Sequence, residues 1–460
     1  MTLSVPVAAF EGDATLPLSA DVVVIGGGIV GVMTALELAE AGVSVALCEK
    51  GVIAGEQSSR NWGWVRQMGR EEAELPLASA SLALWRVMDT RIKGTTGFRQ
   101  AGITYAAFTR RDADHWMRWH EIGNRYGIET TLLNSERVKA GTPELAGDVR
   151  MALWSPQDGY AEPWLAVPAM AQAARGAGVA VVTQCAVRSL DIEGGRVTGV
   201  VTERGRIRAQ KVVIAAGAWS RTLLGNHDID FPQLRLIGTV ARVVGAQGLP
   251  DHPFGTENFS FRPRLDGGHT LTLRNANIAE IVPDNFRLFR QYLPRLIENW
   301  REFHLRIGPS FLKDLSLSRH WDADRPTIFE AVRSLDPSPS KPFLERAVRN
   351  ASKVFPQFAH ARTTHAWAGV MDVTPDAVPV VDQIPGLAGA YIASGCSGHG
   401  FGLGPGLGRL AADMLLDRPP IVDPKPFRWN RFTSSKTAEP GSSDRSPASG
   451  PEAPDRSASS

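Results

Sequence analysis

Three glycines near the N-terminus, Gly26, Gly28 and Gly31, have the G-x-G-x-x-G spacing of a phosphate-binding turn. The apolar run 21–25 predicts a buried strand before this turn, and the pattern of 29–41 predicts a helix after it. Glycines let the backbone approach a pyrophosphate, and the free N–H groups at the helix N-terminus stabilise its charge.

A second predicted strand, 43–47, ends just before Glu49, where a carboxylate can accept hydrogen bonds from both ribose hydroxyls of an adenosine. Strand, turn, helix, strand and acid together predict dinucleotide binding. The alternative is that the three glycines serve helix–strand packing alone.

A second glycine-rich segment lies near the other end of the chain. Residues 394–415 read SGCSGHGFGLGPGLGRLAADML, with seven glycines from Gly395 to Gly408. Each glycine adds to the conformational entropy lost on folding, so packing alone explains the run poorly. We expect a ligand to lie against bare main chain here.

The composition is that of an ordinary globular protein. The chain has 460 residues, enough for two or three folding units, with 43% hydrophobic residues, 21% charged residues and a formal net charge of +2. Because there is no dense basic block, nucleic acid is not expected as a partner. No stretch is apolar enough for a transmembrane helix and the first twenty residues make a poor secretory signal, so a cytoplasmic protein is predicted.

The sequence contains no motif typical of a disulfide framework, a metal site or another class of catalysis. The cysteines Cys48, Cys185 and Cys396 are odd in number and far apart, which fits neither a disulfide framework nor a metal cluster. No Cys/His metal spacing, GxSxG elbow or phosphate-binding lysine motif occurs, so no metal is expected. Residues 433–460, with nine serines, four prolines and no aromatic residue, predict a disordered tail.

The middle of the chain indicates which dinucleotide is bound. A nicotinamide dehydrogenase continues as a regular alternation of strands and helices, whereas 51–77 is rich in Gly, Ser, Trp and Arg. Much later come a hairpin-like pair at 187–210 and an apolar strand at 211–220. A dinucleotide domain with such a large interruption is more typical of FAD proteins than of NAD proteins.

Four motifs, taken together, resemble the D-amino-acid oxidase-like superfamily of FAD-dependent oxidoreductases, especially its sarcosine oxidase and amine or amino-acid dehydrogenase branches. They are VVVIGGGIVG, SSRNWGW followed by VRQMGR, VVIAAGAWS, and WAGVMDVTPDAVPVVD with GAYIASGCSGHGFGLGPG. The resemblance covers about residues 20–430.

The resemblance implies an α/β fold with a discontinuous, Rossmann-like FAD-binding domain and an inserted α+β substrate domain built on a mixed sheet. The FAD-binding domain is expected at 18–75, 160–228 and 365–430, and the substrate domain at 76–159 and 229–364. A helical pattern at 75–92 and a strand-like pattern at 269–275 fit this division.

Non-covalent FAD is implied, because the cysteine that tethers the flavin in sarcosine oxidases is Gly369 here and SSRNWGW contains no histidine. The residues expected to bind the cofactor are Gly26, Gly27, Gly28, Ile29, Val30, Gly31, Glu49, Lys50, Ser58, Ser59, Arg60, Val187, Ala216, Gly217, Trp219, Gly395, Gly398, Gly400, Phe401 and Gly402.

In this family the last glycine-rich loop runs beneath the flavin ring. A strand is therefore expected at 390–393 and the loop at 394–404, with Pro405 near the first position of a helix. The positive end of that helix would point at the flavin and stabilise the reduced cofactor. The apolar face of the helix is expected to comprise Leu407, Leu410, Ala411, Met414 and Leu415.

Candidate catalytic and substrate residues lie in the same motifs. His399 is a candidate to accept a proton or to bind the amine, since an ordinary pKa of about 6.5 suits either role; alternatively it only supports the loop. Arg66 corresponds roughly to an arginine that binds the substrate carboxylate in sarcosine oxidases. Trp62 and Trp64 are expected to form aromatic walls of the substrate pocket, with core packing as the alternative.

Two departures from the family pattern bear on the substrate. Met371, in the expected pocket, stands where glycine oxidases have an arginine, and Gly402 stands where sarcosine oxidases have a lysine. Two carboxylate-binding cations are therefore missing, which disfavours a simple small α-amino acid. A secondary or N-substituted amino acid, or an amine with a distal carboxylate, fits better.

The leading prediction is an FAD-dependent oxidoreductase that oxidises a C–N bond of an amine or N-substituted amino acid by hydride transfer to the flavin. Oxygen or another compound would then accept the electrons. Two alternatives stay open: a 2-hydroxyacid or other C–O dehydrogenase of the same fold, and a non-catalytic flavoprotein subunit.

Overall fold

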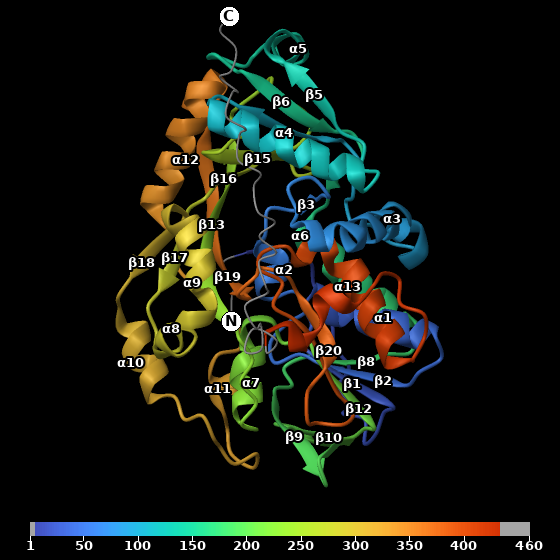
Figure 1. Cartoon of the computed structure of the whole chain (residues 1–460). Helices are drawn as coiled ribbons and strands as arrows, with labels where there is room; N and C mark the ends of the chain where they lie inside the picture. The colour runs from blue at the N-terminus through green and yellow to red at the C-terminus, as the bar shows by residue number, and fades with distance from the viewer. Residues whose placement is uncertain (1–4, 433–460) are drawn as a thin grey trace, which may run out of the picture.

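Two large sheets dominate the protein, one in the lower and one in the upper part of Figure 1. The structure is a computed structural model that describes residues 5–432, without the side chains of residues 299 and 301. The predicted tail at 433–460 lies outside the described residues.

The first sheet has six strands, in the order β20-β21-β12-β1-β2-β8. All neighbouring pairs from β21 to β8 are parallel, and β20 runs antiparallel to β21. The strands are β1 (Val22–Ile25), β2 (Val45–Cys48), β8 (Ala180–Val182), β12 (Lys211–Ile214), β20 (Val380–Gln383) and β21 (Ala390–Ser394).

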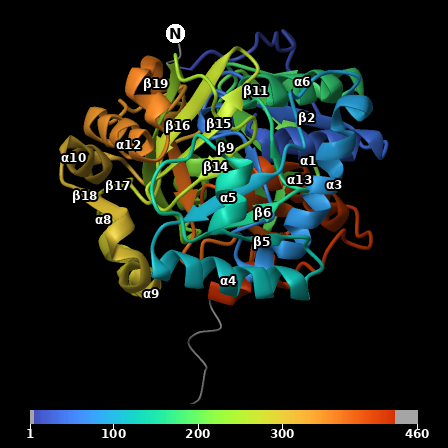
Figure 2. The same cartoon turned by 90° about the horizontal axis from the view of Figure 1, so that it is seen from above.

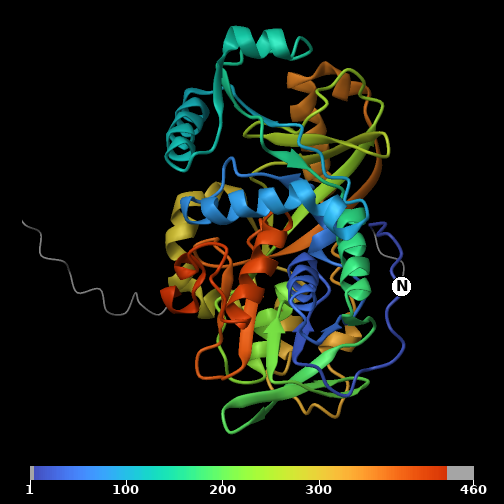
Figure 3. The same ribbon diagram turned by 90° about the vertical axis from the view of Figure 1, so that its right-hand side faces the viewer.

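The two faces of this sheet pack into different hydrophobic cores, because successive residues of a strand point to opposite sides. Val22 and Val24 pack with four helices, whereas Val23 and Ile25 pack with a small antiparallel sheet. Figure 3 shows three of the helices, α13, α1 and α6, side by side beneath α3. The elements are α1 (Ile29–Glu40), α3 (Leu75–Ile92), α6 (Pro163–Gly176) and α13 (Gly400–Leu415), and β9 (Val187–Glu193), β10 (Arg196–Thr202) and β11 (Gly205–Arg208).

The second sheet has ten strands and mixes parallel with antiparallel pairs. Its order is β18-β17-β13-β16-β15-β14-β4-β6-β5, with β19 also paired to β13. The strands are β4 (Ile103–Ala107), β5 (Thr131–Asn134), β6 (Met151–Ser155), β13 (Leu234–Val244), β14 (Phe254–Gly255), β15 (Phe259–Arg264), β16 (Gly268–Leu273), β17 (Asn277–Glu280), β18 (Phe303–Arg306) and β19 (Arg362–Val373).

Helices cover this second sheet on both sides. Helix α12 (Lys341–Val354) packs Ala347 and Ala351 against β13, β15 and β16, and α4 (Arg110–Arg125) packs Trp116 and Trp119 against β4 and β6. Figure 2 shows α4 along one edge and α12 with α8 to α10 on another side. The remaining helices and strands are α2 (Gln57–Arg60), α5 (Ser135–Gly141), α7 (Ser220–Gly225), α8 (Pro283–Arg287), α9 (Phe289–Asn299), α10 (Pro309–Ser316), α11 (Ile328–Ala331), β3 (Trp64–Val65) and β7 (Gly159–Tyr160).

The α/β fold class is confirmed, and several local predictions agree with the structure. The helix predicted at 29–41 is α1, and the pattern at 75–92 is α3 with the same bounds. The strand pattern at 269–275 is β16, and the hairpin-like segment 187–210 forms β9, β10 and β11. The predicted strand 211–220 is shorter, since β12 ends at Ile214 and a 3-10 turn follows at Gly217–Trp219.

The prediction for the second glycine-rich segment is wrong in one respect. The helix does not begin near Pro405: α13 begins at Gly400, and Pro405 lies inside it. A proline there lacks an N–H and disturbs the helical hydrogen bonds around it. Ser81 of α3 compensates, because its hydroxyl donates to the Gly402 carbonyl (2.8 Å) and accepts from the Gly406 N–H (3.1 Å). Trp85 Nε1 donates to the same Gly402 carbonyl at 3.0 Å.

The division into two domains stays a prediction. Helix α3, which the predicted boundary at residue 76 assigns mainly to the substrate domain, packs in one core with α1 and α13. None of the helices in the described part of the chain is long and apolar enough to cross a membrane.

Candidate active site

A first cavity lies where the turn after β1, the end of β2 and the segment after β12 meet. Nine of the residues predicted at the cofactor line it, which supports a common ligand for the separate motifs. They are Gly26, Gly28, Glu49, Lys50, Ser58, Val187, Ala216, Gly217 and Trp219.

A second cavity adjoins the first and lies at the N-termini of α1 and α13. The two share the wall residues Gly28, Gln57, Ser58, Ala215, Gly217 and Asp372. Five further predicted residues line only the second cavity: Ile29, Val30, Gly398, Gly400 and Phe401. The N-termini of both helices thus line the second cavity, which favours negative charge on its occupant.

The other predicted cofactor residues, Gly27, Gly31, Ser59, Arg60, Gly395 and Gly402, do not line either cavity. Arg60 is almost completely buried, pairs with Asp336 at 2.6 Å and donates to the Ala368 carbonyl at 3.0 Å. A Cβ atom on Gly402 would lie 3.2 Å from the Trp64 carbonyl oxygen. Arg60 and Gly402 therefore pack behind the cavity walls and are not part of the lining.

Glu49 and Lys50 are fixed by neighbouring groups. The Glu49 carboxylate accepts hydrogen bonds from the N–H groups of Gly27 (2.7 Å) and Gly51 (2.6 Å). Burial raises the pKa of Glu49, against the lowering effects of Lys50 and these two N–H groups. Lys50 Nζ lies 2.8 Å from Glu56 Oε1 and 4.5 Å from the ring centroid of Trp219. The glutamate therefore closes the turn while it faces the first cavity.

Asp372 shapes the second cavity, although sequence reasoning assigned it no role. Its buried carboxylate, at the end of β19, accepts hydrogen bonds from the N–H groups of Gly395 (2.7 Å) and Cys396 (3.2 Å). Burial raises the pKa of Asp372, while these N–H groups lower it. The position of Asp372 inside the WAGVMDVTPD motif is the sequence signal that could have identified it.

Gln57 is a second wall residue that the sequence analysis missed. Its Oε1 atom is buried and has no hydrogen-bond partner in the described structure, although Gln57 lines both cavities. A Cβ atom on Gly369 would lie 2.2 Å from this oxygen. Buried polar groups are normally satisfied, so this amide favours a polar ligand in the cavities.

A segment far away in sequence contributes to the wall of the first cavity. Phe329 of α11 lines the cavity and packs edge-on against Trp219, with ring centroids 5.6 Å apart. The Leu335 N–H donates to Glu56 Oε1 at 3.0 Å, and Arg333 forms an ion pair with Glu203. The predicted domain division assigned this segment to the substrate domain.

His399 lies directly before α13 and is paired with a buried acid. Its Nδ1 atom is 3.0 Å from Oε1 and 2.9 Å from Oε2 of Glu74. Burial lowers the pKa of His399, Glu74 raises it, and Arg70 and Arg66 lower it. His399 does not line the second cavity, but its neighbours Gly398 and Gly400 do.

The predicted substrate residues gather beside this pair. Arg66 donates to the Met68 carbonyl, and its guanidinium carbon lies 5.8 Å from the ring centroid of Tyr105. Trp62 and Trp64 meet edge-to-face, and buried Trp64 also packs against Tyr105. Met371 lies against Gly398, where a Cβ atom would be 3.0 Å from the methionine sulfur.

A third and larger hollow, of about 1080 Å³, lies between α7, β13 and the segment 280–338. Its wall carries many charged residues that pair with each other, such as Arg221 with Asp230 and Asp284, both at 2.7 Å. It borders the first cavity through Ala218 and Val370, but none of the predicted site residues lines it.

Comparison with known proteins agrees with this arrangement. The profile of the FAD dependent oxidoreductase family (DAO) matches residues 21–414. The chain belongs to this family. Its relatives include amino-acid and amine oxidases, as the sequence motifs led us to expect.

Three relatives show how far the similarity extends. The L-amino acid deaminase of Proteus myxofaciens, solved in complex with anthranilate, has 29% sequence identity, a TM-score of 0.89 and coverage of 94% of this chain and 98% of its own. The glycine oxidase of Pseudomonas aeruginosa is 28% identical over 89% of this chain and 98% of its own length. The sarcosine oxidase subunit beta of an Arthrobacter species is 25% identical over 90% of this chain and 91% of its own.

The residues of this FAD-dependent oxidoreductase fit the cofactor of the family. Gly26 has a φ of +114°, and Gly26, Gly28 and Gly217 bring bare backbone to the cavity wall. Glu49 presents a carboxylate at the end of β2, where ribose hydroxyls are recognised. The unpartnered Gln57 Oε1 atom and the two helix N-termini offer polar contacts for the remaining parts of FAD.

Proposed function

We propose that the protein oxidises a C–N bond of an amine or amino acid that carries a carboxylate, and that the resulting imine is hydrolysed to a carbonyl compound and an amine. The observation that supports a carboxylate on the substrate is a group of three arginines, Arg66, Arg70 and Arg274, around Tyr105. The relatives named as glycine oxidase, sarcosine oxidase subunit and L-amino acid deaminase support the same substrate class.

The arginines surround Tyr105 beside the His399–Glu74 pair. The Arg274 guanidinium carbon lies 4.5 Å from the Tyr105 ring centroid, and the ring of Trp116 stacks on Tyr105 with centroids 4.1 Å apart. Arg70 is buried, and its Nε and Nη1 atoms have no hydrogen-bond partner in the described structure. Burial, together with the charge of Arg66, lowers the pKa of Arg70 to about 9.

No carboxylate of the described residues forms an ion pair with any of the three arginines, although Arg66 donates to the Met68 carbonyl and Arg274 Nη1 donates to the Thr256 carbonyl at 3.2 Å. Arg70 is the buried member of the group, and a buried cation without a partner is costly. A guanidinium binds a carboxylate through two parallel hydrogen bonds, so a substrate carboxylate would provide the partner that Arg70 lacks. Arg70 and Arg274 therefore replace, in our proposal, the cations that are missing at Met371 and Gly402.

Bound FAD supplies the hydride acceptor for the two-electron oxidation. The chain's own residues prepare the substrate: the arginines bind its carboxylate, and Trp62, Trp64 and Met371 exclude water. His399 accepts the proton of the substrate ammonium group, because only a neutral amine has the lone pair that assists loss of hydride.

An anaerobic flavin-bleaching panel tests the proposal. Amines with a carboxylate should reduce the flavin, whereas carboxylate-free amines and 2-hydroxyacids should not. Arg70→Met should raise the Kd of a reactive substrate about ten- to a hundredfold, as expected for lost charged hydrogen bonds. Arg125→Met is the matched control, since Arg125 pairs with Glu72 on the surface.

Bleaching by 2-hydroxyacids alone would support a C–O dehydrogenase. Flavin that no small substrate reduces, although dithionite does, would support a non-catalytic subunit. Equal rates with carboxylate-free amines would contradict the role of the arginines.

FAD is proposed to be bound without a covalent link. Gly369 stands at the tethering position of the resemblance, and Gln57 Oε1 occupies the space that a side chain there would need. Acid precipitation should release all of the FAD into the supernatant. Flavin that stays with the precipitated protein would contradict the proposal.

A cytoplasmic location is also proposed, with oxygen or another small acceptor for the electrons. Cys48, Cys185 and Cys396 are free thiols, as is usual in a reducing compartment. Cell fractionation and measurement of hydrogen peroxide during turnover would test both statements.

A further inference from the structure

Glu74 and His399 are separated by 325 residues along the chain and form a close pair in the fold. The Glu74 side chain is completely buried, and 18% of the His399 side chain is exposed. Both carboxylate oxygens lie within 3.0 Å of His399 Nδ1. The pair is therefore a fixed internal contact rather than a surface ion pair.

Both partners are held by rigid elements. Glu74 directly precedes α3, and His399 directly precedes α13. The two helices are joined by the hydrogen bonds of Ser81 and Trp85 to the Gly402 carbonyl. Because these bonds lie within the first turns of α13, the imidazole has little freedom to leave the carboxylate.

The contact determines which imidazole nitrogen carries the proton. An ionised carboxylate has no hydrogen to donate, so Nδ1 must donate and therefore bears the proton. In the neutral imidazole, Nε2 is then the acceptor. The charged groups that act on His399 are Glu74, which favours the protonated ring, and Arg70 and Arg66, which oppose it together with burial.

We propose that Glu74 is a positioning residue that keeps the proton of His399 on Nδ1 and so makes Nε2 the proton acceptor of the active site. This inference rests on the proposed function. In the step concerned, the N–H bond of the substrate ammonium breaks, an N–H bond forms at Nε2, and the nitrogen retains its electron pair. The imidazolium that results faces the carboxylate of Glu74, which stabilises its charge.

NMR of ¹⁵N-histidine-labelled, FAD-loaded protein tests the tautomer without any substrate. The signal that disappears in His399→Asn is assigned to His399, and wild type should show protonated Nδ1 and unprotonated Nε2. Glu74→Gln should increase the share of the Nε2-protonated form, whereas Glu74→Asp should retain the wild-type form. Glu72→Gln, which changes an exposed acid two residues away, is the control. A wild-type His399 protonated on Nε2 would overturn the inference.

Flavin reduction by a reactive amine, measured against pH, tests the consequence. Glu74→Gln should lower the limiting rate about ten- to a hundredfold, within the range of general-base effects. Its pH profile should also shift to lower pH, because loss of the negative charge lowers the pKa of His399 further. Glu74→Asp should retain most of the wild-type limiting rate and a pH profile close to that of wild type.

An unchanged pH profile in Glu74→Gln, with wild-type rates, would refute the positioning role. If no amine reduces the wild-type flavin, the proposed function fails instead, and the tautomer measurement still decides the state of His399. Retained FAD binding in Glu74→Gln, measured by flavin fluorescence, shows that the variant is folded.

Discussion

The helices α1 and α13 begin at the same cavity and are both rich in glycine, but their glycines serve different purposes. At α1 the glycines bring the chain close to its own turn and to β12. A Cβ atom on Gly26 would lie 2.4 Å from the Ala215 carbonyl oxygen, and one on Gly31 would lie 2.1 Å from the Gly26 carbonyl oxygen. With a φ of +114°, Gly26 also has a backbone conformation that other residues rarely adopt.

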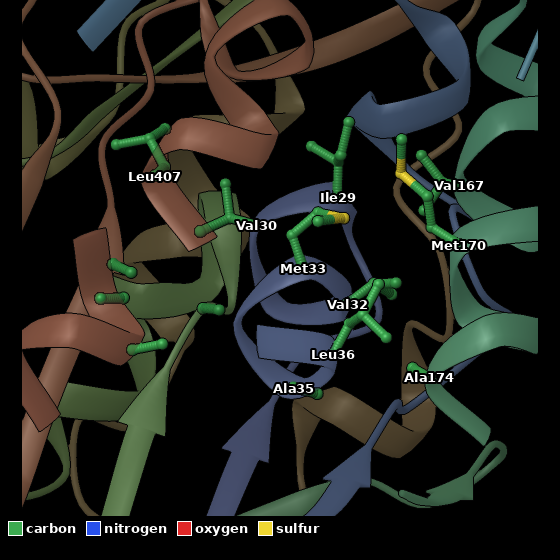
Figure 4. Close-up of a cluster of buried hydrophobic side chains, with 14 of the residues drawn as sticks. Ile29, Val30, Val32, Met33, Ala35, Leu36, Val167, Met170, Ala174 and Leu407 are labelled. Carbon is green, nitrogen blue, oxygen red and sulfur yellow. The ribbon is translucent and has the colours of Figure 1, made fainter. Parts of the chain in front are cut away.

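At α13 most of the glycines lie inside the helix and face other helices. A Cβ atom on Gly404 would lie 2.6 Å from Ile29, and one on Gly408 would lie 2.5 Å from Met33 Cβ, both on α1. A Cβ atom on Gly406 would lie 2.9 Å from Ser81 on α3. Figure 4 shows the result for α1, which lies between Leu407 of α13 on one side and Val167 and Met170 of α6 on the other.

Two physical requirements thus produce similar compositions. A turn beside a ligand needs glycine for backbone conformation and backbone contact, whereas closely packed helices need it because a methyl group would separate them. Substitutions should therefore affect different properties in the two segments.

Gly31→Ala should have the largest effect. The new methyl group meets a carbonyl oxygen of the turn itself, which cannot move without disrupting the end of β1. We expect a loss of about 3 kcal/mol or more in the free energy of unfolding and no FAD uptake. Urea unfolding and fluorescence titration of the apoprotein with FAD measure the two effects. Normal FAD affinity in this variant would show that the turn tolerates a side chain.

Gly408→Ala should lower stability by about 2 kcal/mol through overpacking between α13 and α1. The affected contact with Met33 lies more than one helical turn from the cavity lining at Gly400 and Phe401. FAD affinity should therefore change less than the free energy of unfolding. In Gly31→Ala, by contrast, FAD uptake is expected to be lost. A loss of FAD binding without a loss of stability would contradict the distinction between the segments.

Ser81→Ala tests how α13 accommodates Pro405. Loss of the hydroxyl leaves the buried Gly406 N–H without its partner, which should cost about 1–2 kcal/mol. In the Pro405→Ala background the helix regains a backbone donor and can straighten, so the cost of Ser81→Ala should be smaller by about 1 kcal/mol. Thermal unfolding of the four proteins in this double-mutant cycle gives the coupling. Strict additivity would show that Ser81 and Pro405 are independent.

The comparison of α1 with α13 also explains which features could be predicted from the sequence. The unit from β1 to Glu49 follows from local spacing, because the turn, the helix and the acid are neighbours in sequence. The 18 residues of α3 follow from their periodicity. Pro405 was misleading because a proline usually marks a helix start, and the groups that permit it within the helix, Ser81 and Trp85, lie more than 300 residues away.

The candidate site shows the same limit. Gly26, Gly28, Glu49 and Gly398 could be assigned from motifs, and each lines a cavity. Long-range pairs could not be assigned in this way, because neither Glu74 with His399 nor Gln57 with Gly369 leaves a periodic or spaced signal. Only the folded chain brings these side chains together.

Gly176→Ala should have the smallest effect and the opposite sign. Gly176 is the exposed last residue of α6, and a Cβ atom there would have no neighbour within 4 Å. Alanine reduces the conformational entropy of the unfolded chain, so we expect a gain of about 0.5 kcal/mol with unchanged FAD affinity. This variant is the matched control for Gly408→Ala, since both replace a helical glycine with alanine and only one meets a neighbouring helix. If both variants lost equal stability in thermal unfolding, the cost at Gly408 could not be assigned to the contact with Met33, and close packing would no longer explain the glycines of α13.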